Sequence, residues 1–365
     1  MNKYIYILLF ALATLTSCKI RKVDEKQGFI NANDKDILYT GRIDLQNDSP
    51  AVLFWPGTTV KINFKGSDLS VILKDAHKKN YYNVILDGKI LSVLNPDSVK
   101  TSYHLISGIA KGNHTLELFK RTEWNQGSTL FYGFKTGKGT KLLAPPKSSD
   151  RTIEFFGNSI TAGYAIGDTI NDSPDGMFTN NYLTYGALTA RHYNANYYCT
   201  ARGGIGVTIS WFPLIMDEMY NRLDPEDASS KWNFKKVTPD IVVINLFQND
   251  SWLVEKPDYP EFKHRFGDQK PTEEFIISKY EDFLKKIRKT YPDARIVCAL
   301  GTMDGTVKGS PWPGYIKNAV EQMNDPKIYT LFFPYQEYEG HPEVRTHRKM
   351  ANSLISFIDR NSLWD

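Results

Sequence analysis

The sequence is poor in cysteine and has no excess of charge of either sign. It has 3 cysteines among 365 residues, and its 45 basic and 41 acidic residues leave a formal net charge of +4. A scaffold held together by many disulfides is therefore excluded, and no basic block or acidic tail points to nucleic acid as a partner. Cys199 and Cys298 each lie in an apolar, strand-like segment, where we expect buried free thiols rather than a disulfide.

Long hydrophobic runs are also missing. The apolar run from Tyr4 to Leu15 is too short to cross a membrane as a helix, and with Lys3 before it and small residues after it, it is typical of a cleaved signal. Leu15-Thr-Ser-Cys18 resembles the bacterial lipobox, in which the cysteine is acylated after cleavage. We expect residues 1–18 to be a lipoprotein signal and residues 19–27 a tether. The protein would then be exported and anchored to a membrane of the bacterial cell envelope through Cys18. An ordinary secretory signal with a chance cysteine is the alternative.

Residues 28–145 contain no helical pattern of useful length. Short segments of strand character recur there between turn signals such as Pro56-Gly57 and Asp87-Gly88. Several of them alternate apolar with polar residues, as strands with one buried face do. We predict a β-sandwich of the jelly-roll type. The predicted strands are 51–55, 59–64, 69–73, 82–86, 103–106, 114–119 and 130–134.

The periodicity changes within residues 146–365. Five apolar strand segments alternate there with helical patterns, of which 272–291 and 343–360 are the clearest. Alternating strands and helices indicate a parallel sheet that is covered by helices on both faces. The predicted strands are 153–156, 195–200, 240–246, 295–300 and 328–332.

The first of these strands breaks at Gly157 and presents Asn158 and Ser159. A strand followed by a sharp turn and a small polar residue places a hydroxyl at the carboxyl edge of a parallel sheet, where such folds bind ligands. Ser159 is therefore the candidate nucleophile. A serine after a glycine is more often a turn residue or a helix cap, so the hypothesis depends on the residues at the ends of the other strands.

Two groups suited to binding an oxyanion come after the next two strands. Consecutive glycines in Gly203-Gly204-Ile-Gly206 let the backbone approach a ligand and direct N–H groups at it, although they could equally form a flexible turn. Asn249 and Asp250 lie just beyond the third strand. An asparagine N–H is a common donor to a developing oxyanion, whereas an Asn-Asp pair by itself is more often a helix cap.

A histidine comes after the last strand. His341 has Glu339 two residues before it, and Pro342 would keep it in the loop ahead of the closing helix. A neutral imidazole can take a serine proton, and a nearby carboxylate can fix its tautomer and stabilise the imidazolium. His347, in contrast, lies at packing spacing with Met350 in that helix, so we expect it in the core.

These motifs together resemble the SGNH (GDSL-type) hydrolases, a flavodoxin-like fold. Gly157-Asn-Ser-Ile-Thr161 resembles their block I, Gly204 sits at the oxyanion glycine of block II, Gln248-Asn249-Asp250 resembles block III, and His341 resembles the block V histidine. With a β-sandwich ahead of block I, carrying Trp55-Pro-Gly57 and Lys120-Arg-Thr-Glu123, the chain resembles carbohydrate esterase family two. Members of that family are two-domain enzymes that remove acetyl groups from plant polysaccharides such as xylan and glucomannan.

The resemblance implies a serine esterase that needs no metal or other cofactor. Ser159 would be the nucleophile, His341 the general base and Glu339 its acidic partner. The backbone N–H groups of Ser159 and Gly204, with the Asn249 side chain, would form the oxyanion hole. The acetylated carbohydrate would be the partner molecule. Trp252 and Trp312 follow the third and fourth strands and are candidates to stack on a sugar ring, with core packing as the alternative for each.

The sequence also departs from the family pattern. Asn158 replaces the usual Asp of block I, and Gln248 replaces the block III glycine, which can reshape the pocket. Tyr338 stands where the general SGNH pattern has an acid, and some members use a backbone carbonyl in place of Glu339. Two other functions remain open: an SGNH lipase or thioesterase acting on acyl chains, and a non-catalytic surface lipoprotein that binds glycans.

Overall fold

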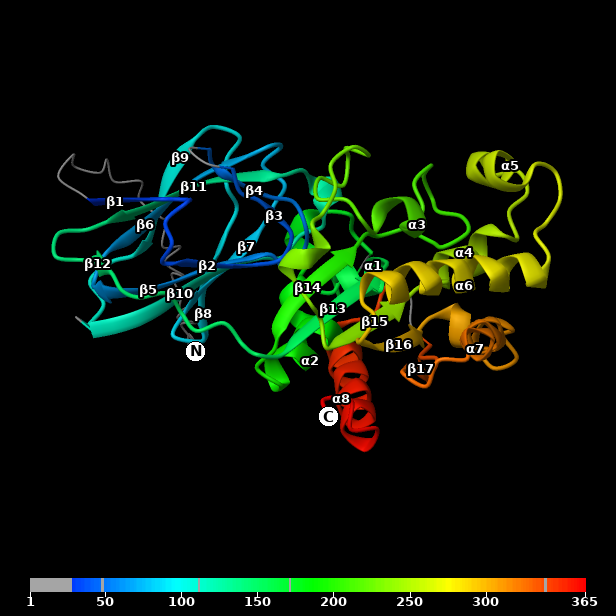
Figure 1. Ribbon diagram of the computed structural model, residues 1–365. Coiled ribbons are helices and arrows are strands. Elements are labelled where there is room, and N and C mark those ends of the chain that lie inside the picture. Colours follow the sequence, from blue (N-terminus) through cyan, green and yellow to red (C-terminus); the bar gives the residue numbers. More distant parts are fainter. Residues whose placement is uncertain (1–27, 47–48, 111, 171, 338–339) are drawn as a thin grey trace, which may run out of the picture.

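A two-sheet β-domain precedes an α/β domain in the chain, and the two pack side by side (Figure 1). The computed structural model describes residues 28–46, 49–110, 112–170, 172–337 and 340–365. The predicted signal, tether and lipid-anchor residue Cys18 lie outside these residues. No helix in the described residues has both the length and the apolar character that crossing a membrane requires.

The first domain consists of two antiparallel six-stranded sheets, so the predicted β-sandwich is confirmed. One sheet has the order β3-β4-β11-β6-β9 with β1 paired to β11, and the other has the order β12-β5-β10-β7-β8 with β2 paired to β5. In β5, Val60, Ile62 and Phe64 are fully buried, while Lys61 between them is partly exposed. The strands are β1 (Gly28–Asn31), β2 (Ile37–Thr40), β3 (Ile43–Asp44), β4 (Ala51–Leu53), β5 (Thr59–Gly66), β6 (Leu69–Asp75), β7 (Tyr82–Leu86), β8 (Lys89–Leu94), β9 (Thr101–Ile106), β10 (Gly112–Lys120), β11 (Thr129–Thr136) and β12 (Lys141–Leu142).

Five of these strands do not appear in the sequence prediction: β1, β2, β3, β8 and β12. Most are too short to show an alternating pattern, since β3 and β12 have 2 residues each. The edge strand β8 is longer, but its residues from Lys89 to Val93 are all exposed. A strand without a buried face gives no hydrophobic periodicity to read.

The second domain has a five-stranded parallel sheet with the order β14-β13-β15-β16-β17. All five predicted strands are confirmed as β13 (Thr152–Gly157), β14 (Asn196–Ala201), β15 (Ile241–Asn245), β16 (Arg295–Leu300) and β17 (Ile328–Phe332). The order 2-1-3-4-5 is that of flavodoxin-like folds, which bind ligands where the strand order reverses, here at the carboxyl ends of β13 and β15.

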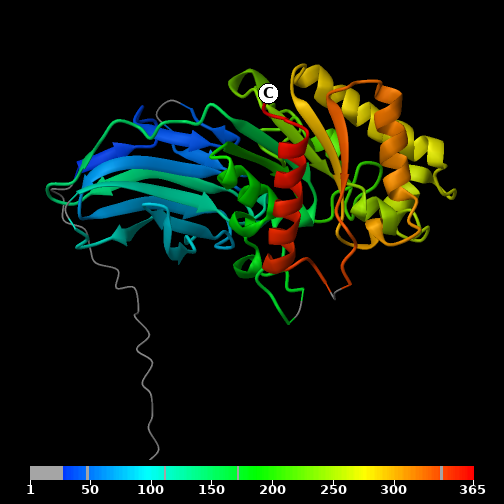
Figure 2. The same ribbon diagram turned by 90° about the horizontal axis from the view of Figure 1, so that it is seen from below.

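Helices cover both faces of this sheet. Alternate residues of β13 point to opposite faces, so that Phe155 packs with α2 and α8, whereas Phe156 packs with α6 and α7. Figure 2 shows α8 on one face of the sheet and α6 and α7 on the other. The helices are α1 (Ser159–Ala162), α2 (Tyr185–His192), α3 (Met216–Met219), α4 (Gln248–Leu253), α5 (Pro260–Phe266), α6 (Glu273–Thr290), α7 (Trp312–Met323) and α8 (Val344–Arg360).

The two clearest predicted helices are confirmed as α6 and α8. At the start of α6, the Thr272 side chain accepts the N–H of Phe275, and Glu273 and Glu274 follow in the first turn. Arg288 and Lys289 lie in its last turn, so the charges at both ends interact favourably with the helix dipole and stabilise the helix. The cysteines of β14 and β16 are also as expected, since Cys199 and Cys298 are buried free thiols.

The two domains share a hydrophobic core and a buried ion pair. Phe54, Trp55 and Trp124 of the sandwich belong to the same cluster of buried side chains as Phe156 of β13. Arg42 of the sandwich lies 2.8 Å from Glu154 of β13, and their side chains are 2% and 1% exposed.

Further hydrogen bonds support this ion pair. The Arg42 guanidinium donates to the carbonyls of Tyr220 and Arg222, and the Tyr291 hydroxyl donates to the other Glu154 oxygen at 2.5 Å. A buried charge without a partner is costly. Arg42 of the sandwich and Glu154 of the α/β domain therefore each depend on the other domain for a partner.

Candidate active site

Ser159 is the first residue of α1, directly after the turn that ends β13. The Asn158 side chain caps this helix by accepting the Ile160 N–H at 3.0 Å, so the amide that replaces the family's Asp performs the capping role. Gly157 is required because a Cβ there would lie 2.0 Å from the Thr161 hydroxyl. Gly163, at a φ of 82°, ends the helix after one turn. The short helix leaves Ser159 at the carboxyl edge of the sheet.

His341 lies between the hydroxyl of Ser159 and the carboxylate of Asp172. Its Nε2 is 2.8 Å from Ser159 Oγ, and its Nδ1 is 2.5 Å from Asp172 Oδ2. The backbone N–H of His341 donates to the other Asp172 oxygen at 3.2 Å. Burial raises the pKa of Asp172, but the hydrogen bonds from His341 and the electrostatic interaction with its imidazole outweigh it and leave that pKa below its ordinary value. An ionised Asp172 favours the Nδ1–H tautomer of His341, with Nε2 free to accept the serine proton.

The sequence predicts Glu339 as the acidic partner of His341 and does not point to Asp172. Glu339 lies outside the described residues, and the carboxylate that the structure places on His341 is Asp172. This residue belongs to the irregular segment between α1 and α2, so no strand end or periodic pattern marks it. In the structure, Gly340 has a φ of 81°, and a Cβ there would lie within 3.3 Å of the Asp172 side chain, so the approach of Asp172 favours a glycine next to His341.

Gly204 and Asn249 line the same pocket as Ser159, as the sequence predicts for an oxyanion hole. Gly204 has a φ of 82°, which favours glycine. Asn249 is 3% exposed; its Nδ2 donates to the Ile205 carbonyl at 2.8 Å, and its Oδ1 accepts the Trp211 indole N–H at 3.0 Å. These contacts fix the amide and leave one of its two N–H bonds without an acceptor among the described residues.

Asp250 ties α4 to the segment that carries Gly204, residues 202–210, which we call the oxyanion loop. Asp250 is fully buried and accepts the N–H groups of Val207, Thr208 and Ile209 at 3.0, 2.6 and 3.3 Å. Burial raises its pKa, and these hydrogen bonds oppose that rise. Asp250 therefore holds the far end of the loop. It directly follows Asn249 in the chain, so the loop is fixed next to this oxyanion-hole candidate.

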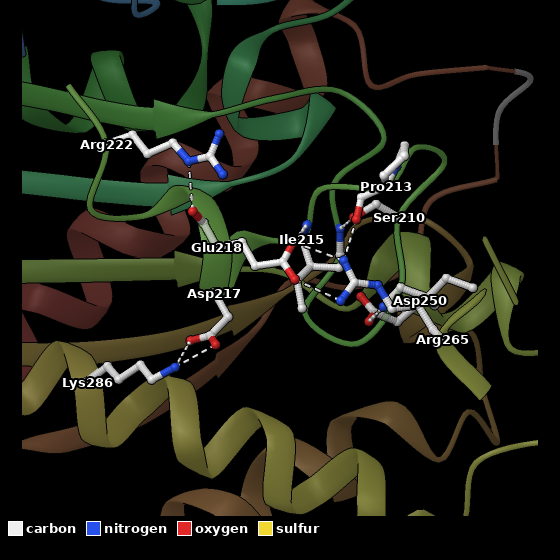
Figure 3. A network of polar contacts seen from close by, with 11 residues as sticks. Ser210, Pro213, Ile215, Asp217, Glu218, Arg222, Asp250, Arg265 and Lys286 are labelled. Carbon is white, nitrogen blue, oxygen red and sulfur yellow. Dashed lines mark hydrogen bonds and ion pairs between the residues drawn. The ribbon is translucent and has the colours of Figure 1, made fainter. Parts of the chain in front are cut away.

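The chain beyond the oxyanion loop is held by a second set of polar contacts, which Figure 3 shows around Glu218. Glu218 accepts the N–H of Ile215 at 3.2 Å and forms an ion pair with Arg265 at 2.8 Å. Arg265 also donates to the Pro213 carbonyl, and Lys286 pairs with Asp217. The loop that shapes one wall of the pocket is therefore anchored to α5 and α6.

The pocket at Ser159 has a volume of about 480 Å³ and a partly aromatic wall. Tyr164, Trp211, Trp252 and Tyr335 line it together with the polar side chains of Asp304 and Gln336. The indole N–H of Trp252 donates to Asp304 Oδ2 at 2.8 Å, which fixes the plane of the ring. Trp252 is therefore placed where the sequence predicts a sugar-stacking residue, and Trp211 is an aromatic wall residue that the sequence analysis missed.

Trp312 is a correction to the sequence prediction. It is 6% exposed and packs at the start of α7, with ring centroids 5.0 Å from Phe247 and 5.3 Å from Tyr315. Trp312 therefore packs in the core, which was the alternative to sugar stacking. The reason is that Trp312 lies on the apolar face of α7, and this face packs against the sheet. Gln248 is also turned away from the pocket, since its Oε1 accepts the Gly305 N–H at 3.0 Å.

No group of three or more His, Cys, Asp or Glu side chains suited to a metal ion occurs in the described part of the chain.

His347 is 1% exposed and accepts the backbone N–H of Tyr185 at 3.1 Å, so its predicted place in the core is confirmed.

Comparisons with known proteins match both halves of the chain. Residues 39–146 match the family model "Carbohydrate esterase 2 N-terminal", and residues 155–326 match the "GDSL-like Lipase/Acylhydrolase family". Among solved structures, a family two carbohydrate esterase from Clostridium thermocellum in complex with cellohexaose is 34% identical, with a TM-score of 0.80, covering 90% of this chain and 100% of that one. A family two carbohydrate esterase from Cellvibrio japonicus shares the fold, with a TM-score of 0.82 at 20% identity over 93% of this chain and 99% of that one.

Two curated relatives show the same similarity. The chain is 34% identical to the cellulase/esterase CelE of Acetivibrio thermocellus over 90% of its own length, but spans only 40% of that longer protein. It is 24% identical to an acetylxylan esterase / glucomannan deacetylase of Cellvibrio japonicus, over 92% of this chain and 91% of that protein.

Proposed function

Because the chain belongs to family two of the carbohydrate esterases, we propose that it is a serine esterase that removes O-acetyl groups from plant polysaccharides or oligosaccharides such as xylan and glucomannan. The observation that carries the proposal is the line of hydrogen bonds from Asp172 through His341 to Ser159, at 2.5 and 2.8 Å, which opens on a pocket lined by Gly204 and Asn249. A nucleophile, its base and oxyanion donors around one cavity are what acyl transfer to water requires.

The proposed reaction proceeds through an acetyl-enzyme. Ser159 Oγ attacks the acetyl carbonyl while His341 Nε2 accepts its proton, and Asp172 stabilises the imidazolium. The N–H groups of Ser159, Gly204 and Asn249 stabilise the tetrahedral oxyanion. His341 then gives the proton to the departing sugar oxygen. Water attacks the acetyl-enzyme by the same route, and acetate leaves.

The pocket walls favour a sugar over a long acyl chain. Trp252 offers a ring fixed by Asp304, and Gln336 and Asp304 offer hydrogen-bond partners for hydroxyl groups. A lipase or thioesterase needs a long apolar channel, and the mixed lining of this pocket does not support one. Relatives named acetylxylan esterase / glucomannan deacetylase also support a carbohydrate substrate.

Chromogenic acetyl and octanoyl esters test the proposal. We expect wild type to hydrolyse the acetyl ester well above the octanoyl ester, and Ser159→Ala to lose activity by a factor on the order of a thousand or more. Acetate release from acetylated xylans, mannans and pectins then identifies the glycan. Turnover that does not depend on Ser159 would contradict the mechanism, and a preference for octanoyl esters would favour the lipase alternative.

We also propose that the protein is exported and anchored through a lipid on Cys18, which lies outside the described residues. The support is the basic residue, short apolar run and lipobox-like Leu15-Thr-Ser-Cys18. In a bacterial host, labelled palmitate should enter wild type but not Cys18→Ser, and the variant should move from the membrane to the soluble fraction. An unlabelled, soluble wild type would overturn the anchor.

A further inference from the structure

The sandwich domain reaches the oxyanion loop through two adjacent side chains, Glu123 and Trp124. They come shortly after β10, with Glu123 just before the 3-10 turn η1 (Trp124–Gln126). Glu123 is 2% exposed and Trp124 is 6% exposed. A carboxylate buried this far must have partners, and those partners lie in the other domain.

Both side chains hold the start of the oxyanion loop. The Glu123 carboxylate accepts the backbone N–H of Gly203, and a Cβ on residue 203 would lie 3.2 and 3.3 Å from its two oxygens. The guanidinium of Arg202 lies 4.3 Å from the ring centre of Trp124 and 3.3 Å from that of Phe212. The approach of Glu123 is close enough to favour a glycine at position 203.

The sandwich also fixes Glu123 from its own side. The fully buried Lys120 donates its ammonium N–H groups to the backbone carbonyls of Thr122 and Glu123, at 2.9 and 3.3 Å. These bonds hold the backbone that carries the carboxylate. Glu123 is thus a rigid acceptor rather than a mobile surface group.

We propose that Glu123 is a positioning residue for the esterase reaction: by holding the N–H of Gly203, it orients the next peptide so that the N–H of Gly204 faces the oxyanion formed at Ser159. The N–H groups of Gly203, Gly206 and Val207 all have acceptors, at Glu123, Ser210 and Asp250. In the part of the chain that the structure describes, that of Gly204 has none. Glu123 holds the near end of the loop and Asp250 the far end. The inference rests on the proposed function, because it concerns the oxyanion of that reaction.

Two substitutions of similar size in the full chain test the role of the acceptor. In Glu123→Gln the side-chain carbonyl can still accept the Gly203 N–H, whereas in Glu123→Met nothing can. We expect Glu123→Met to lower kcat on an acetyl ester by about 10- to 100-fold with KM within about threefold, because a displaced oxyanion donor acts in the transition state. Glu123→Gln should stay within about fivefold of wild type in kcat. Glu117→Ala is the control: Glu117 lies on the preceding strand β10 and pairs with Lys61, so this substitution should leave kcat unchanged.

A second measurement separates positioning from a general structural role. A small alkyl boronic acid forms a tetrahedral adduct with the active serine, whereas a deacetylated xylo-oligosaccharide only occupies the sugar site. Glu123→Met should weaken the boronic acid about as much as it lowers kcat and leave oligosaccharide binding within about twofold. If Glu123→Met does not fold, Glu123→Ala is judged by the same two measurements.

Three results would overturn the proposal: an unchanged kcat in Glu123→Met, an equal loss of boronic acid and oligosaccharide binding, or a loss in Glu123→Gln as large as in Glu123→Met. The last result would mean that the charge of Glu123 acts, and not its hydrogen bond. Failure of the proposed function is distinct, since wild type itself would then not turn over acetyl esters.

Discussion

His341 takes its two partners from an earlier part of the chain, far away in sequence. Ser159 precedes it by 182 residues and Asp172 by 169. Ser159 is fixed by the turn after β13, whereas Asp172 comes from an irregular segment that meets His341 only in the folded protein. The hydrogen bonds proposed for catalysis therefore depend on two loops with different kinds of support.

We predict that Asp172, and not Glu339, supports His341. Asp172→Ala should lower kcat by about a hundredfold or more, because the imidazolium loses its counter-charge and the tautomer its fixing bond, whereas Glu339→Ala should change kcat by less than about threefold. Steady-state kinetics on an acetyl ester measure both variants, with circular dichroism as the check on folding. The reverse order of effects would restore Glu339 to the role that the sequence suggests.

Trp252 and Trp312 should differ in what they change. Trp252→Ala removes a wall of the pocket, so we predict a KM for acetylated oligosaccharides raised by about 5- to 50-fold with little loss of thermal stability. Trp312→Ala leaves a cavity in the core and should cost about 3–5 kcal/mol of unfolding free energy. Urea unfolding and kinetics on the two variants separate these effects. An equal loss of stability in both would argue against a substrate role for Trp252.

Helices place several groups that the chemistry does not use but the fold requires. α8 closes the domain and brings His347 against the first residue of α2, where burial lowers the pKa of His347 to about 3. Its Nδ1 accepts a backbone N–H and cannot be protonated without losing that bond. Through His347, α8 therefore makes the free energy of unfolding depend on pH.

The sign of this pH dependence is set by linkage. In the unfolded chain His347 binds a proton below about pH 6.5, whereas in the folded chain it does so only near its lowered pKa of about 3. Between these two pH values the unfolded chain binds more protons, so the free energy of unfolding decreases as the pH falls. Between about pH 7.5 and pH 5, wild type should lose about 2 kcal/mol more unfolding free energy than His347→Gln. Urea titrations at both pH values measure the difference. Parallel pH profiles of the two proteins would show that His347 is not the group responsible.

The sandwich domain and the α/β domain depend on each other for burial of side chains. The sandwich supplies Phe54, Trp55 and Trp124 to the core of the α/β domain and Arg42 to the buried Glu154. Removing one member of a buried ion pair costs about 3–5 kcal/mol, which is a large part of the about 5–15 kcal/mol of unfolding free energy that a typical native protein has.

We therefore predict that residues 146–365 alone do not form an active esterase. The fragment should express poorly or unfold without a cooperative transition, and its kcat on an acetyl ester should be at least about tenfold below that of the full chain. Residues 28–145 added as a separate chain are the control, and should restore part of the activity. A fragment as stable and active as the full chain would show that the domains are independent.

The architecture and the residues at the strand ends follow from the pattern of amino acids along the chain. Periodicity is a local property, so β13 to β17, α6 and α8 could be read from it, and parallel strands necessarily bring Ser159, Gly204 and Asn249 to one edge of the sheet. Exposed or very short strands such as β8 and β3 could not be predicted, because they have no buried face to produce a hydrophobic pattern.

The groups that support the site, in contrast, are known only from the folded protein. The carboxylate on His341 is Asp172, the acceptor at Gly203 is Glu123 from the other domain, and Trp312 is in the core. None of these can be deduced from spacing along the chain. Which side chain an irregular loop meets depends on where the packed sheets and helices hold that loop, and this is a property of the whole fold.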